Sequence, residues 1–99
     1  MNTKTHKQLA KLLIKINNQK IAESFLENLF TPDEIEEITQ RLEILRLLNK
    51  GMTQREISKK LKVSIGTVSR GARIHKFGKP GLNQVIAWWQ PSTIWQMWS

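Results

Sequence analysis

The sequence predicts an all-α protein with about six helices. Apolar residues recur at i, i+3, i+4 and i+7 in several segments, which is the spacing of amphipathic helices. No window shows a sustained alternation of apolar and polar residues, so no strand is predicted. Two capping boxes, TPDE at 31–34 and TQRE at 53–56, mark the starts of two of the helices.

The first helix is expected over residues 3–17, where Asn17 and Asn18 mark its end. Its apolar stripe consists of Leu9, Leu12, Leu13 and Ile16. A second, shorter helix follows, whose stripe consists of Ile21, Phe25, Leu26 and Leu29.

A long third helix is predicted over residues 33–50. Thr31 is its N-cap, Pro32 its first helical residue, and Gly51 suits the left-handed position after its end. One stripe carries Ile35, Ile38, Leu42, Leu45 and Leu48, and Ile44 and Leu47 widen it. Because this apolar surface is wider than one small monomer is expected to cover, a tightly packed homodimer is predicted, with a monomeric three-layer core as the alternative.

Two short helices joined by a tight turn follow, which is the pattern of a helix-turn-helix. The first runs from the Thr53 cap to Leu61, and the second from the Ser64 cap through Ile74. Ser58 is the small residue at the crossing, and the pair is held together by Ile57, Leu61, Val63 and Val68. Lys62 stands where such turns usually place glycine, at a cost of about 1 kcal/mol.

A short last helix is expected over residues 82–89, ahead of Pro91. All four tryptophans lie in the last twelve residues: Trp88, Trp89, Trp95 and Trp98. The predicted organisation is a helical dimerisation core over residues 1–81, with the helix-turn-helix at 53–74. A C-terminal helix and Trp-rich tail occupy residues 82–99.

Charge points to a polyanionic partner. The net charge is +8, and residues 50–81 hold nine Lys or Arg against the single acid Glu56. A cytoplasmic protein is expected, since the sequence has no signal peptide and no apolar run long enough to span a membrane. An enzyme is not expected, because there is no cysteine, no metal-ligand spacing and no glycine-rich phosphate loop; no metal or catalytic cofactor is predicted.

The second helix of the pair suits double-stranded DNA. Small residues at its start let its N-terminus approach base edges and phosphates. Arg55 on the preceding helix is within reach of a guanine or a phosphate. The expected base-facing residues are Ile65, Gly66, Thr67 and Ser69, and the expected phosphate contacts include Lys59, Arg73 and Lys76.

Over residues 21–80 the chain resembles the tryptophan operon repressor family. The motifs that carry the resemblance are TPDE, QRLEI, TQREIS and SIGTVSRG. The resemblance implies an intertwined all-helical homodimer that binds a palindromic operator, with L-tryptophan as corepressor. It also places the DNA-facing positions, which fall on Gln54, Arg55, Ile65, Gly66, Thr67, Ser69 and Lys76. Ser64, the cap of the second helix, is also expected among the DNA-binding residues.

The resemblance further implies a ligand site. Two arginines of the family sandwich the indole, and they fall on Arg41 and Arg70. Gly71 leaves room beside the ring, while Thr31 and the carbonyl groups from Asn28 to Phe30 hold the amino group of the ligand. A planar guanidinium suits both tasks, because it stacks on an aromatic face and pairs with a carboxylate.

The chain departs from the family pattern at Arg73 and Ile74, where small polar residues are usual. Two alternatives therefore stay open: a related DNA-binding regulator that does not sense tryptophan, and, from another functional class, a helical protein-interaction adaptor.

Overall fold

The computed structural model describes residues 3–78 and 81–89, and they form six α-helices. These are α1 (Thr3–Leu13), α2 (Gln19–Leu29), α3 (Pro32–Asn49), α4 (Gln54–Leu61), α5 (Ile65–Phe77) and α6 (Leu82–Trp88). No strand occurs among the described residues. The all-α prediction is thus confirmed. The chain divides into two compact units, one ending at Glu36 and the other beginning at Glu37. Trp95 and Trp98 lie outside the described residues.

In unit 1, α1 ends earlier than the sequence predicted. The backbone N–H groups of Lys15 and Ile16 donate to carbonyls three residues back, so the last turn tightens and the α-helix stops at Leu13. Asn18 belongs to the next helix, where its side-chain oxygen accepts from the N–H groups of Lys20 (2.9 Å) and Ile21 (3.2 Å). An asparagine that was expected to mark a helix end is therefore an N-cap.

The long helix α3 begins and ends as its local chemistry predicts. The N–H of Thr31 donates to Glu34 Oε1 (2.9 Å), and the N–H of Glu34 donates to Thr31 Oγ1 (3.2 Å), which completes a reciprocal capping box. At the other end Gly51 adopts φ +95°, and the N–H of Met52 donates to the carbonyl of Leu47 (3.1 Å). This pair of features is a Schellman C-cap.

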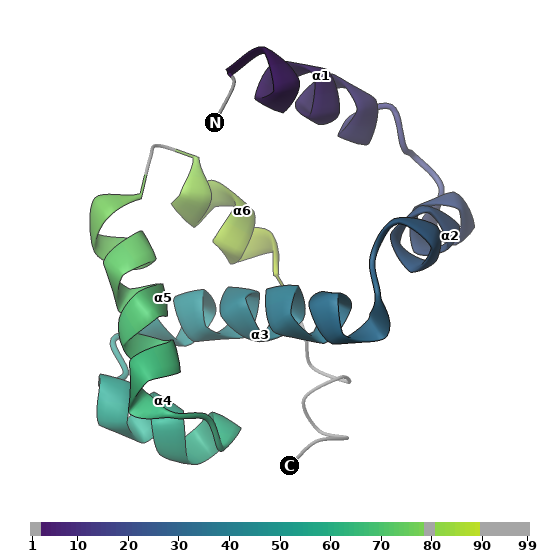
Figure 1. Cartoon of the computed structure of the whole chain (residues 1–99). Coiled ribbons are helices and arrows are strands. Elements are labelled where there is room, and N and C mark those ends of the chain that lie inside the picture. The colour runs from purple at the N-terminus through teal and green to yellow at the C-terminus, as the bar shows by residue number, and fades with distance from the viewer. Residues whose placement is uncertain (1–2, 79–80, 90–99) are drawn as a thin grey trace. The chain divides into compact units, whose positions relative to one another are not determined.

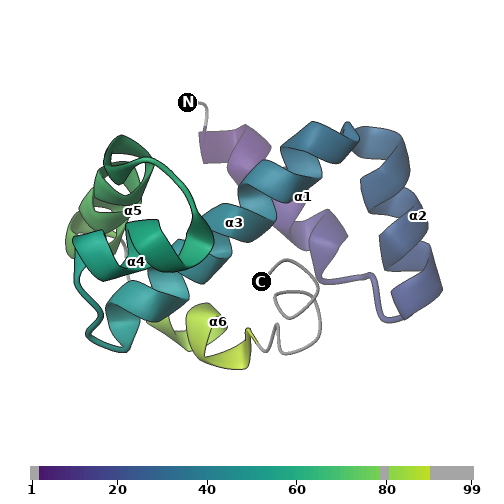
Figure 2. The same ribbon diagram turned by 90° about the horizontal axis from the view of Figure 1, so that it is seen from below.

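The core of unit 2 gathers on the last turns of α3. Ile44, Leu47, Ile57 and Val68 form one buried cluster, and four half-buried residues pack against it: Leu48, Met52, Leu61 and Val63. In Figures 1 and 2, α4 and α5 lie at the C-terminal end of α3, with α6 beside α3. Ile86 of α6 is buried as well. Ile44 and Leu47, which were expected only to widen the apolar stripe of α3, are thus central to the core of unit 2. Ile38, which was expected on the stripe itself, remains exposed.

A buried carboxylate in α3 was not predicted. Glu43 is only 1% exposed and accepts hydrogen bonds from Arg46 Nε (2.9 Å), from Arg46 Nη2 and from the indole Nε1 of Trp89 (3.2 Å). The hydrogen bond to Glu43 raises the pKa of the Arg46 guanidinium, although burial lowers it in part. This cluster ties the residue after α6 to α3. Trp88, the last residue of α6, is by contrast 74% exposed.

Candidate functional site

The turn between α4 and α5 is a hydrogen-bonded helix-turn-helix. Lys62 adopts the left-handed conformation expected for it (φ 57°, ψ 46°). The carbonyl of Ser58 accepts from the N–H of Val63 (3.1 Å), while the Ser58 hydroxyl donates to the Val63 carbonyl (2.6 Å). Ser58 is therefore more than a small residue at the crossing, because its hydroxyl and carbonyl both close the turn.

The start of α5 is fixed by its N-cap. The Ser64 hydroxyl accepts from the N–H of Thr67 (3.1 Å). Beyond the cap one face of α5 is open: a Cβ added at Gly66 would meet only Ser64 Oγ, at 3.9 Å. The exposed residues of the two helices include nearly all the predicted DNA contacts, namely Gln54, Arg55, Lys59, Ser64, Ile65, Gly66, Ser69, Arg73 and Lys76. These nine residues are called the recognition face below.

One hydrogen bond links α4 and α5 on the recognition face. Ser69 Oγ donates to Gln54 Oε1 (2.8 Å), which leaves the amide nitrogen of Gln54 as a donor. Donors of this kind suit phosphate oxygens and the acceptors of base edges. Near the end of α5 the ammonium group of Lys76 lies 5.4 Å from the centre of the Phe77 ring. The recognition face thus combines neutral donors with solvated cations, as a polyanion partner requires.

Thr67 differs from the nine residues of the recognition face in its exposure. It is half-buried, and its hydroxyl is hydrogen-bonded to Ser64 Oγ (2.8 Å). Its side chain lines a hollow between α3 and α5. In α5 Thr67 precedes the buried Val68, whereas Gly66 and Ser69 are exposed. Thr67 therefore lines the hollow, and its expected contact with DNA stays a prediction.

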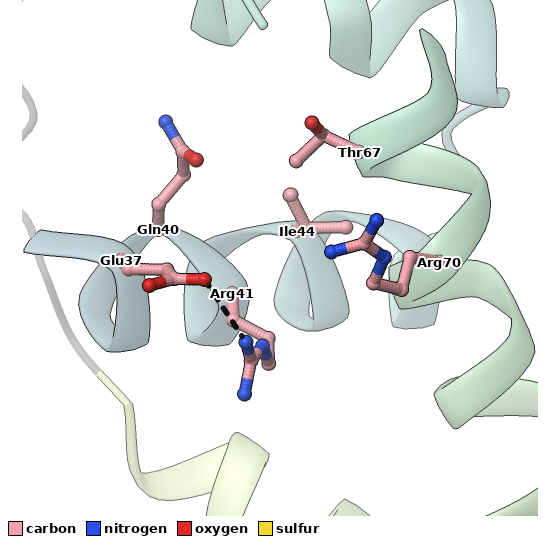
Figure 3. A pocket seen from close by; sticks show the side chains of 7 residues that line it. Glu37, Gln40, Arg41, Ile44, Thr67 and Arg70 are labelled. Carbon is pink, nitrogen blue, oxygen red and sulfur yellow. Dashed lines mark ion pairs between the residues drawn. The ribbon is translucent and has the colours of Figure 1, made fainter. Parts of the chain in front are cut away.

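The hollow lies behind α5 and opens to solvent. It is lined by Glu37, Gln40, Arg41 and Ile44 from α3 and by Thr67, Arg70 and Gly71 from α5. Figure 3 shows Arg70 reaching from α5 toward Ile44 on α3, and Arg41 paired with Glu37 on α3. Arg41 Nη2 and Glu37 Oε1 are 3.5 Å apart. Two guanidinium groups and one carboxylate therefore border an apolar floor, an arrangement that suits a small ligand with an aromatic body and charged groups.

Gly71 brings α5 close to α3 at the floor of the hollow. A Cβ added at this residue would lie 2.6 Å from Ile44 Cγ2, closer than carbon atoms approach without a shift. Gly71 is buried and Ile44 is only 1% exposed. The glycine that was expected to leave room for a ligand therefore also permits the helix crossing.

The other expected ligand residues belong to unit 1. The side-chain nitrogen of Asn28 donates to the carbonyl of Ser24 (2.7 Å), Phe30 is the half-buried C-cap of α2, and Thr31 caps α3. Arg73 and Ile74, where the sequence departs from the family pattern, are not among the residues that line the hollow.

Three lining residues were missed from the sequence. Glu37, Gln40 and Ile44 lie four residues before, one before and three after Arg41. Residues at i−4 and i+3 share one helix face, so the position of Arg41 was the available signal for Glu37 and Ile44.

Within the described ranges, no group of three or more His, Cys, Asp or Glu is placed to hold a metal ion. Among the same residues, no helix combines the length and the apolar character needed to cross a bilayer.

Comparison with known proteins identifies the family. Residues 4–89 match the sequence model described as "Trp repressor protein". A Trp operon repressor homolog of Vibrio vulnificus (strain YJ016) is 38% identical over 84 residues, which cover 80% of this chain and 82% of the relative. Homologs of the same name from Vibrio campbellii (40% over 70 residues, 70% of each chain) and Haemophilus influenzae strain PittEE (36% over 78 residues, 78% of this chain and 74% of the relative) are also similar. No solved structure matches. The chain therefore belongs to the Trp repressor family, whose members are DNA-binding transcriptional regulators and not enzymes.

Proposed function

We propose that this DNA-binding repressor acts as a homodimer on a palindromic operator, with L-tryptophan as its corepressor and genes of tryptophan biosynthesis or transport as its targets. Family membership supports the DNA-binding repressor part of this proposal. The observation that carries the corepressor part is the hollow, where Arg41 of α3 and Arg70 of α5 line one cavity behind the recognition face. The relatives are called Trp operon repressor homologs, which supports tryptophan genes as the targets.

The chemistry of the hollow suits an indole amino acid. Ile44 supplies an apolar floor, and each arginine presents a planar cation that stacks on an aromatic ring or pairs with a carboxylate. Neutral carbonyl groups from Asn28 to Phe30, together with Thr31, remain our prediction for the amino group. Arg70 follows Ser69 of the recognition face directly, so a ligand that contacts Arg70 bears on the helix that meets DNA.

The mechanism is a linkage between two sites. The ligand favours the orientation of α4 and α5 in which the ligand makes its best contacts. It can shift the equilibrium between orientations only by the difference in its affinities for them. In a two-fold symmetric dimer, two recognition helices must fit successive major grooves about 34 Å apart. L-Tryptophan is expected to favour that spacing.

The apolar faces of unit 1 support a homodimer. Large apolar side chains of α1 and α2 are 41% to 60% exposed within one chain: Leu9, Leu12, Leu13, Ile21, Leu26 and Leu29. No residue of α2, all of which is described, is buried. Two amphipathic helices with solvated apolar stripes are stable when another surface covers them, and a second copy of the chain supplies one. Light scattering after size exclusion, with twice the mass of the chain as the expected result, tests this step.

Titration calorimetry of L-tryptophan into the purified protein tests the corepressor. Binding of one ligand per chain is expected, with L-phenylalanine as a weaker control. A duplex selected from a random pool with tryptophan present then serves in fluorescence anisotropy, where added tryptophan should tighten DNA binding. Binding to this duplex that is equally tight with and without tryptophan would instead favour a family regulator with no tryptophan sensing.

The same duplex separates a DNA-binding repressor from an adaptor. The logarithm of the binding constant should fall linearly with the logarithm of salt concentration, with a slope of about −0.9 per phosphate neutralised. A hydrophobic adaptor surface would respond weakly.

A further inference from the structure

The hollow contains an acid beside its arginines. Glu37 lies one helical turn before Arg41 on α3, and the two side chains form an ion pair at 3.5 Å between Glu37 Oε1 and Arg41 Nη2. Figure 3 shows both at the α3 side of the hollow, while Arg70 reaches in from α5. The three charged groups that line the hollow therefore carry a net charge of +1, not the +2 of two arginines alone.

We propose that Glu37 is a specificity-determining residue of the hollow, which selects ligands that carry an ammonium group together with a carboxylate. This inference rests on the proposed corepressor function. The ion pair engages Oε1 of Glu37, and its second oxygen is the acceptor that we assign to the ligand's ammonium group. Arg70, from the other wall, is the matching donor for the carboxylate.

The assignment follows from charge balance. An ammonium group has three N–H donors, so an interaction with Glu37 leaves two for neutral carbonyl groups. A hydrogen bond between ions is roughly twice as strong as one between neutral groups. A ligand with a carboxylate alone leaves Glu37 facing its negative charge, whereas a zwitterionic amino acid satisfies both ends.

A purely structural role does not explain why Glu37 lies beside the hollow. Its side chain is 63% exposed, and that of Arg41 is 46% exposed. Solvated ion pairs four residues apart on a helix contribute little to stability. A carboxylate at the mouth of a cavity changes which ligand the cavity accepts much more than it changes the fold.

The test compares three ligands by titration calorimetry: L-tryptophan, tryptamine, which has only the ammonium group, and indole-3-propionate, which has only the carboxylate. Glu37→Gln keeps the size of the side chain and removes its charge. Glu36→Gln is the matched control, because Glu36 is the exposed neighbour on α3 and does not line the hollow.

Glu37→Gln should change the affinities for tryptamine and indole-3-propionate in opposite directions. In Glu37→Gln, the affinities for L-tryptophan and tryptamine should fall about tenfold, which corresponds to 1.4 kcal/mol. The affinity for indole-3-propionate should rise, since Arg41 is no longer neutralised. Glu36→Gln should leave the order of the three ligands unchanged. Loss of fold cannot imitate this pattern, because it would weaken all three ligands together.

Two outcomes overturn the inference in distinguishable ways. If the unmodified protein binds L-tryptophan and Glu37→Gln changes the three affinities no more than Glu36→Gln does, Glu37 has no role in selection and the corepressor proposal stands. If the unmodified protein binds none of the three ligands, the corepressor proposal fails, and the inference about Glu37 fails with it.

Discussion

Two glycines of α5 are expected to respond in opposite ways to the same substitution. Alanine in a helix interior is more favourable than glycine by about 0.5–1 kcal/mol, so each Gly→Ala change begins with that gain. At Gly66 the new methyl group meets only Ser64 Oγ at 3.9 Å, which is ordinary contact. Because Gly66 lies in the first turn of α5, Gly66→Ala should stabilise the protein by at most this helix-propensity difference.

At Gly71 the methyl group would lie 2.6 Å from Ile44 Cγ2. The clash is hard to relieve, because Cγ2 is attached directly to Cβ, and a β-branched side chain has one strongly preferred rotamer in a helix. Ile44 is also packed in the buried cluster of unit 2. Forcing an extra methyl into a packed core costs about 1–3 kcal/mol. After the helix gain, Gly71→Ala should lower the free energy of unfolding by about 1 kcal/mol, the middle of a range of roughly 0–2.5 kcal/mol.

Urea unfolding at one fixed chain concentration, followed by far-UV circular dichroism, measures both variants under the conditions that an oligomer requires. Ile44→Leu supplies the cross-check, since it moves the branch from Cβ to Cγ and removes Cγ2 at nearly constant volume. In that background Gly71→Ala should be much less destabilising, and the double-mutant cycle should show the coupling. A Gly71→Ala protein as stable as Gly66→Ala would refute the close approach of α5 to α3.

Further predictions concern the turn, the buried acid, the hollow and the recognition face. Lys62→Gly should raise the free energy of unfolding by about 1 kcal/mol, because glycine adopts the left-handed conformation without strain; thermal unfolding checks this. Glu43→Ala should lower the free energy of unfolding by about 3 kcal/mol, because the partly buried Arg46 loses its acceptor; chemical denaturation measures this. Trp89→Phe removes only one hydrogen-bond donor to Glu43 and should lower the same free energy by about 1 kcal/mol. Arg70→Leu should abolish calorimetric binding of L-tryptophan and leave the mass measured by light scattering unchanged. Gly66→Glu should remove binding to the selected duplex at every tryptophan concentration, and retained binding would mean that another helix meets the DNA.

The helix boundaries that depend on local chemistry could be predicted from the sequence. The boxes at Thr31 and Thr53, the cap at Ser64 and the left-handed residues Gly51 and Lys62 are all where the sequence places them. Each depends on hydrogen bonds within a few residues, so neighbours alone determine it. The end of α1 was wrong because an asparagine serves equally well after one helix or before the next, and the sequence pattern does not tell which.

Features that depend on residues far apart in the sequence could not be predicted as well. Nothing local marks Glu43 as buried, because its partner Trp89 is 46 residues away in the sequence. Thr67 was predicted as a DNA contact from its place at the start of the second helix and from family resemblance, and nothing local shows that its side chain also lines the hollow. The arginines of the hollow were predicted from family resemblance. Helix spacing from Arg41 was an available signal for Glu37 and Ile44, but it does not show that they line a hollow with Arg70.

The proposed function requires one helix, α5, to contact both DNA and the corepressor, and the residues of α5 divide between two faces accordingly. Thr67, Arg70 and Gly71 line the hollow, while Ser69 and Arg73 are exposed on the recognition face. Gly71 is the middle residue of α5 and lies close to Ile44 of α3, so a tilt about this point moves both ends of α5, including its N-terminal end. The ligand that we propose between Arg41 and Arg70 would act near this point. The coupling is reciprocal, so if tryptophan tightens DNA binding tenfold, DNA must tighten tryptophan binding by the same factor, or 1.4 kcal/mol. Calorimetry of tryptophan into the preformed protein–DNA complex should therefore give a correspondingly lower dissociation constant than calorimetry into free protein, and equal constants would mean that the hollow and the recognition face are not coupled.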